Sequence, residues 1–209
     1  MTHESIIEEA KAFVTRYLQG AESGHDASHA LRVYKNACEI AKTEDCNLLV
    51  VELAALFHDI ADAKFNNGDE EKGSVIATSF LKGKGILGSD ISAIDFIIRN
   101  ISFRKGKVLQ TTTELAIVQD ADRLDAIGAI GIARAFSYGG YKCRPFYDTS
   151  IEPNTLASRE NPNSINHFYE KLLLLKDLMN TAKGKEIAKE RHAFLELYLQ
   201  QFWEEVAIK

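Results

Sequence analysis

Proline is scarce in this chain of 209 residues and is confined to one stretch. The only three prolines are Pro145, Pro153 and Pro162, so no proline precedes residue 145. Because proline interrupts helices, its absence upstream permits long helices there. The sequence also has no alternating strand pattern longer than a few residues, and it therefore predicts an all-α fold.

Cysteine is scarce too, and the three thiols, Cys38, Cys46 and Cys143, do not form a CxxC or zinc pattern. An odd number of unpatterned cysteines favours reduced thiols and a cytoplasmic location. The N-terminal segment is acidic, lacks a long apolar run and is not expected to be a signal peptide. The most apolar segment, residues 48–60, contains Glu52 and ends near a His-Asp pair, so no membrane span is expected.

The charge balance limits the classes of partner expected for this chain. The formal net charge of -5 argues against a nucleic-acid backbone as the main partner, because phosphate neutralisation needs surplus lysine and arginine. A small phosphorylated ligand needs only a local basic pocket and stays compatible with this charge. With 45% apolar and 26% charged residues, the composition is that of an ordinary globular chain.

Apolar periodicity predicts helices along most of the chain. We expect them over residues 6–20, 26–42, 48–61, 70–81, 90–101, 111–125 and 127–136. The segment 48–61 is apolar nearly all round, which is typical of a central buried helix. Thr111 and Glu114 match the Thr-x-x-Glu capping box and predict the start of the sixth helix.

The C-terminal third divides differently. Residues 139–163 predict a long loop with a turn at Gly139-Gly140-Tyr141, and this loop is a candidate substrate lid. Residues 164–209 predict two long helices separated by Gly184, packed as a C-terminal hairpin. Together with a helical metal-binding core over residues 1–138, they are expected to form a single domain.

Two histidine motifs stand where helices begin or end. In His25-Asp26-x-x-His29-x-x-Arg32, His29 and Arg32 are three residues apart and share a helix face. The pair His58-Asp59 lies at the end of the most apolar segment, where both groups are costly to bury unless something satisfies them.

A third motif crowds Asp120, Asp122 and Asp125 into one short segment, and such carboxylates tolerate proximity when a cation or an arginine neutralises them. Imidazole and carboxylate ligands together suit Mn, Fe, Co, Ni or Zn, and Mg is acceptable. The predicted site is one divalent metal ion held by His29, His58, Asp59 and Asp122. Such an ion would lower the pKa of a bound water from about 15.7 toward neutrality.

The ordered set His29…His58-Asp59…Asp122 resembles the signature of the HD-domain superfamily of metal-dependent phosphohydrolases. The flanking segments resemble one bacterial branch that includes nucleoside triphosphate pyrophosphohydrolases: HDxxHxxRV (25–33), HDIADAKF (58–65), ISFRKG (101–106), DADRLDAIGAIGIARAF (120–136) and SINHFYEKLLLLKDLMNT (164–181). The resemblance covers nearly the whole chain and implies an HD-type helical bundle with the same four metal ligands.

The sequence lacks motifs of two related families of hydrolases, and each difference argues against one type of substrate. Asp62 falls where related guanosine tetraphosphate hydrolases carry a Glu-Asp pair, but Ala63 leaves that pair incomplete and argues against alarmone hydrolysis. The sequence also lacks the Gly-Tyr-Pro motif after the core, which argues against cleavage of cyclic dinucleotides.

Other charged residues have two readings each. Asp62 or His25 would orient the water or protonate the leaving group, although Asp26 beside His25 is also a good helix N-cap. Lys64 and Arg32 are either solvated surface charges or ligand-binding groups. Lys64 is expected to bind phosphate, and Arg32 would bind either phosphate or a ligand carboxylate. Asp122 has a structural alternative, a salt bridge with Arg123 or Arg32.

The remaining charged and histidine positions are expected to be structural or exposed. We expect Asp125 to cap or pair on its own helix and Asp120 to be exposed. His167 and His192 are expected to be structural or surface residues.

The expected function is hydrolysis of a small phosphorylated metabolite, with a (deoxy)nucleoside triphosphate cleaved to monophosphate and pyrophosphate by attack of a metal-bound water. The alternatives are a 5′-nucleotidase acting on nucleoside monophosphates and a catalytically silent nucleotide-binding regulatory module. An oxidative di-iron site would need extra histidine ligands, of which the sequence offers few. A homodimer is compatible with the sequence.

Overall fold

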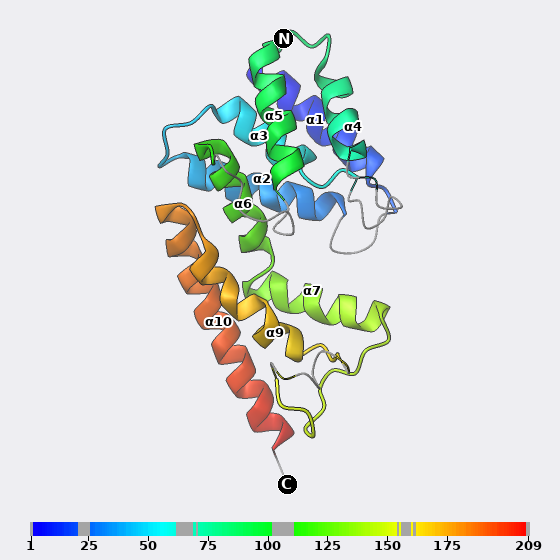
Figure 1. Cartoon of the computed structure of the whole chain (residues 1–209), viewed down its shortest axis with the longest axis vertical. Coiled ribbons are helices and arrows are strands. Elements are labelled where there is room, and N and C mark those ends of the chain that lie inside the picture. The colour runs from blue at the N-terminus through cyan, green and yellow to red at the C-terminus, as the bar shows by residue number, and fades with distance from the viewer. Residues whose placement is uncertain are drawn as a thin grey trace. The chain divides into compact units, whose positions relative to one another are not determined.

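The computed structural model describes residues 2–20, 26–61, 69, 71–101, 111–153, 155, 160 and 162–207. Every regular element within these ranges is a helix, which confirms the predicted all-α class (Figure 1). No helix in the described part of the chain is long and apolar enough to cross a membrane. The chain divides into two compact units, Met1–Asp122 and Arg123–Lys209. The predicted single domain with boundaries near residues 138 and 163 stays a prediction.

The first unit consists of helices around a central apolar helix. Its elements are α1 (His3–Tyr17), α2 (Ala27–Ala41), α3 (Leu48–Phe57), α4 (Lys72–Leu81), α5 (Gly88–Asn100) and most of α6 (Thr113–Asp125). Helix α3 packs against α1, α2 and α5, and all its residues from 50 to 57 are buried (Figure 1). This confirms the predicted central helix, but α3 ends at Phe57 rather than at residue 61, and residues 58–61 form turns.

Two helix starts test the capping predictions. The Asp26 carboxylate accepts a hydrogen bond from the His29 N–H at 2.9 Å, so Asp26 is the N-cap of α2. The capping box predicted at Thr111 is wrong. The Thr112 hydroxyl accepts from the Leu115 N–H at 3.2 Å instead, and Glu114 reaches across to the Asn47 N–H at 3.0 Å. Glu114 therefore satisfies a backbone donor just before α3 instead of one in its own helix.

The second unit contains α7 (Gly128–Tyr141), α9 (Asn166–Glu170), the 3-10 helix η3 (Leu172–Leu178) and α10 (Ala182–Val206). The predicted turn at residues 139–141 is wrong, because these residues form the last turn of α7. A Cβ added at Gly139 would lie 2.0 Å from the Ser164 hydroxyl, so glycine here permits close packing rather than a turn.

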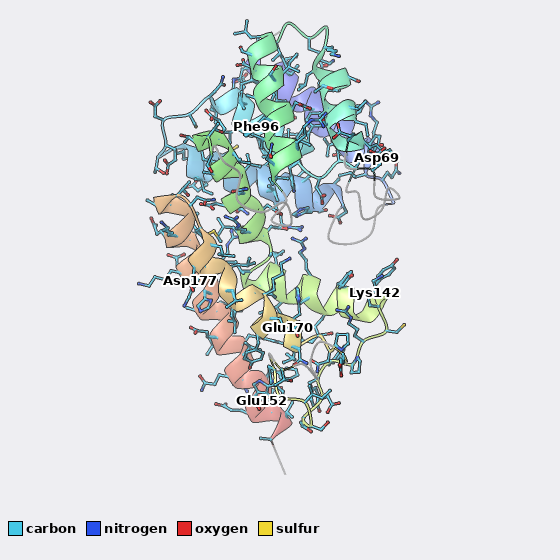
Figure 2. The ribbon with its side chains drawn as sticks, viewed as in Figure 1. Asp69, Phe96, Lys142, Glu152, Glu170 and Asp177 are labelled. Carbon is cyan, nitrogen blue, oxygen red and sulfur yellow. The ribbon has the colours of Figure 1, made fainter. Side chains whose placement is uncertain are left out.

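The C-terminal segment is helical as predicted, but only its second helix is long. The backbone leaves the helical region at Lys171 and divides the first predicted helix into α9 and η3; Figure 2 labels Glu170 at the end of α9 and Asp177 in η3. Gly184 lies inside the first turn of α10, where its N–H donates to the Thr181 hydroxyl at 3.0 Å. Aromatic side chains from α7, α9 and α10 pack together, with the Phe136 and Phe168 ring centres 5.9 Å apart.

Candidate metal centre

Three helices of the first unit supply the predicted metal ligands. His29 lies in the first turn of α2, His58 and Asp59 directly follow α3, and Asp122 lies in the last turn of α6. Both histidines are buried, whereas the side chains of Asp59 and Asp122 are 17% and 42% exposed. The nitrogen donors are thus enclosed, and the carboxylates form the more open side of the group.

The donor atoms of these residues converge. Nε2 of His58 lies 3.2 Å from Nε2 of His29. Oδ1 of Asp122 lies 3.5 Å from His29 Nε2 and 3.8 Å from His58 Nε2. Oδ2 of Asp59 lies 3.9 Å from His29 Nε2. We call His29, His58, Asp59 and Asp122 the four-donor set.

These separations fit atoms arranged around one ion. Ligands about 2.1 Å from a metal are about 3.0 Å apart when adjacent and about 4.2 Å apart when opposite in an octahedron. The observed 3.2 to 3.9 Å falls within that interval, and only the shorter separations approach hydrogen-bond length. Donor atoms of His29, His58 and Asp59 all lie within 4.8 Å of one another, so these residues form a site that could hold a metal ion.

The end of α3 orients the His58 ring. Nδ1 of His58 lies 2.8 Å from the carbonyl oxygen of Ala55. A carbonyl only accepts, so Nδ1 carries a proton, and Nε2 is the ring nitrogen that faces the other members of the site. Ala55 is one of the last four residues of α3, whose carbonyls have no partner within the helix. The early end of α3 therefore supplies the group that fixes this ligand.

The neighbouring aspartates have other surroundings. Asp120 is 0% exposed, so the prediction of an exposed carboxylate is wrong. Most of the C-terminal half of α6 is buried and leaves this position no open face. Asp125 pairs as predicted, but its partner, Arg134 Nη1 at 2.7 Å, lies on α7 rather than on the same helix.

Several predicted site residues lie outside the described residues: His25, Asp62 and Lys64. Arg32 is described, is half-buried and lies on α2 one turn after His29. Arg123, the structural alternative as a partner of Asp122, donates from Nη1 to the Leu178 carbonyl at 2.6 Å.

Sequence reasoning missed a second buried polar group on α3. Glu52 is buried, and its carboxylate accepts from the Tyr34 hydroxyl at 3.0 Å and from the Cys38 thiol at 3.6 Å. It also contacts His3 Nε2. Burial raises the pKa of Cys38 to about 11, and the Glu52 charge adds to the effect. Burial also raises the pKa of Tyr34. The signal was a lone glutamate in the most apolar segment. We call His3, Tyr34, Cys38 and Glu52 the Glu52 cluster.

The chain is similar to known proteins over nearly its whole length. The HD domain family model matches residues 26–127, which include the whole four-donor set. An HD-superfamily hydrolase from Bacillus thuringiensis is 41% identical, with a TM-score of 0.82 over 100% of both chains. Bacillus subtilis YpgQ, an uncharacterized protein, is 36% identical over 95% of this chain and 93% of its own length.

A crystal structure of YpgQ in complex with ADP has a TM-score of 0.79, with 33% identity over 99% of this chain and 98% of that one. The HD domain match and the similarity to HD-superfamily hydrolases place the chain in the class of metal-dependent phosphohydrolases. The chain belongs to the HD-domain superfamily of these hydrolases.

Proposed function

We propose that the chain hydrolyses a phosphoanhydride bond of a ribo- or deoxynucleoside triphosphate and releases a nucleoside monophosphate and pyrophosphate. The observation that carries the proposal is that His29 Nε2 lies 3.2 Å from His58 Nε2 and 3.5 and 3.9 Å from carboxylate oxygens of Asp122 and Asp59. The nucleotide class is supported by the similar protein YpgQ, which was crystallised with ADP.

All four members of the four-donor set would hold one divalent ion, and the mixed nitrogen and oxygen ligands suit Mn²⁺. When bound, the ion supplies a water of lowered pKa and neutralises charge on the phosphoryl oxygens. His58 would contribute its Nε2, in a ring oriented by the bond from Nδ1 to the Ala55 carbonyl. Asp59 and Asp122 contribute two negative charges, which match the charge of the ion.

Positive and proton-transferring groups of the chain would complete the site. Arg32 lies on the same face of α2 as His29, where its guanidinium would bind phosphoryl oxygens. Lys64, six residues after His58, would add a second positive charge. For Asp62 and His25 we propose the proton-transfer roles, with one orienting the attacking water and the other protonating the leaving oxygen.

A metal-supplemented substrate screen tests the proposal. Metal-stripped protein is assayed on nucleoside mono-, di- and triphosphates with and without Mn²⁺, and the products are identified. We expect pyrophosphate from triphosphates only when metal is present. Inorganic phosphate from monophosphates would instead identify a 5′-nucleotidase. Equal turnover with and without metal would overturn the proposal.

A further inference from the structure

Helix α2 carries a second polar side chain on the face that bears His29. Asn36 lies seven residues after His29, and this spacing returns to within about 20° of the same face of a helix. Its Nδ2 donates a hydrogen bond to the carbonyl oxygen of Ala121 on α6, at 3.1 Å. The orientation of the amide follows from its partner, because a carbonyl can only accept.

The acceptor of this bond lies next to a proposed metal ligand. Ala121 is fully buried and directly precedes Asp122. The bond therefore joins the two helices that carry His29 and Asp122, and it does so one residue away from the carboxylate.

Two other hydrogen bonds that α6 makes within the first unit lie farther from Asp122. Glu114, which accepts from the Asn47 N–H, lies eight residues earlier, about 12 Å along the helix axis. Gln119 donates to the Asn100 carbonyl at 3.4 Å, a longer bond than that of Asn36. Of these three bonds, the one from Asn36 constrains the end of α6 that carries the ligand most directly.

We propose that Asn36 is a positioning residue for the metal centre: by holding the Ala121 carbonyl, it keeps Asp122 Oδ1 in register with His29 Nε2 and thereby sets metal affinity. This inference rests on the proposed metal site. The separation it maintains is the 3.5 Å between those two atoms. A carboxylate held in place before the ion arrives loses less conformational freedom on binding, which favours tighter binding.

The test measures Mn²⁺ binding to the metal-stripped full chain by isothermal titration calorimetry. Asn36→Leu keeps the branching and the number of heavy atoms of the side chain but has no donor. Asn36→Asp keeps the shape but presents only acceptors. We expect each to weaken Mn²⁺ binding about 10- to 100-fold, the range typical of residues that orient a ligand. Having two variants keeps the test decisive if one of them does not fold.

Tyr34→Phe is the matched control. It also removes one hydrogen bond between α2 and another helix, the bond to Glu52, but that bond holds no proposed ligand. We expect its Mn²⁺ affinity to equal that of the wild type. An equal loss in Tyr34→Phe and Asn36→Leu would show that general loosening of α2 is responsible and would overturn the inference.

A double-mutant cycle with Asp122→Ala separates the positioning role of Asn36 from the ligand role of Asp122. If Asn36 acts through Asp122, Asn36→Leu has no further effect on affinity once Asp122 is absent. Full additivity of the two losses overturns the positioning role and leaves the metal site standing. Unchanged affinity in Asp122→Ala itself overturns the ligand assignment, and the inference falls with it.

Discussion

Helix α3 carries the buried Glu52 and is directly followed by His58 and Asp59 of the four-donor set. The two groups differ in the atoms that surround their charged side chains. The Glu52 cluster lies along the first half of the helix, and its carboxylate has hydrogen-bond donors from Tyr34 and Cys38. The four-donor set lies at the end of the helix, where nitrogen and carboxylate oxygen are 3.5 to 3.9 Å apart. Protein hydrogen-bond donors satisfy the carboxylate of the Glu52 cluster, whereas the atoms of the four-donor set have the spacing of ligands around a cation.

The buried Glu52 shows that burial of a carboxylate alone does not identify a functional site. Buried charges are tolerated when hydrogen bonds or ions compensate them. Hydrogen bonds compensate Glu52, and for the four-donor set we propose an ion. What distinguishes a candidate metal site is that nitrogen and oxygen atoms able to bind a metal lie close to one another. Substitutions in the four-donor set should therefore change how activity and stability depend on metal. Substitutions in the Glu52 cluster should change the free energy of unfolding but not the dependence on metal.

The largest effect is expected from Asp59→Ala. Loss of this carboxylate should lower metal-dependent pyrophosphate release by about 100- to 1,000-fold, since metal-ion catalysis is worth several kcal/mol. Glu52→Gln, which changes a carboxylate in the Glu52 cluster, is the matched control and should keep nearly full activity. Both are measured at saturating Mn²⁺ and nucleoside triphosphate. Full activity in Asp59→Ala would remove it from the ligand set.

Metal addition should stabilise the wild type by about 2.7 kcal/mol when the free metal is a hundred times its Kd. This stabilisation should vanish in Asp59→Ala and persist in Glu52→Gln. Urea unfolding with and without Mn²⁺ measures it. Equal stabilisation of all three proteins would mean that the ion binds elsewhere and that the two groups on α3 do not differ as described.

Glu52→Leu should unfold more easily by about 2 kcal/mol, because Tyr34 and Cys38 would be left buried without their acceptor. Its Mn²⁺ affinity should be unchanged. Urea unfolding and calorimetry give the two values. Weakened Mn²⁺ binding with unchanged stability would instead make the Glu52 cluster part of the metal centre.

The smallest effect concerns alkaline pH. The pKa of Cys38 rises from 9.0 to about 11 on folding, so between these values the unfolded chain loses this proton before the native one does. Stability should therefore fall as pH rises from 9 to 11. Cys38→Ala should flatten the decline, whereas Cys143→Ala, at an exposed position, should not. The same slope in all three proteins would show that the Cys38 thiol is not held by the Glu52 cluster.

Much of the fold could be predicted from local patterns. The apolar segment after Asn47 predicted the central helix, and Asp26 predicted the start of α2, because burial and capping leave clear local signatures. The position of His29, His58, Asp59 and Asp122 at helix ends also predicted their convergence, and the structure brings them together. Their role as ligands stays a prediction.

The failures arose where a residue's partner is distant in sequence. Glu114 bonds to Asn47 rather than to its own helix, and Gly139 is small because Ser164 packs against it. Asp120 is buried because of how α6 packs, which periodicity alone did not show. The link from Asn36 to Ala121 spans helices α2 and α6, so no local pattern could have predicted it.

The most direct measurement is an anomalous difference map from crystals of the wild-type chain grown with Mn²⁺. We expect one strong peak in the first unit, with nitrogen atoms of His29 and His58 and oxygen atoms of Asp59 and Asp122 each about 2.2 Å away. A strong peak at another position, or a well-ordered site with no peak, would contradict the central claim that these four residues hold a divalent ion.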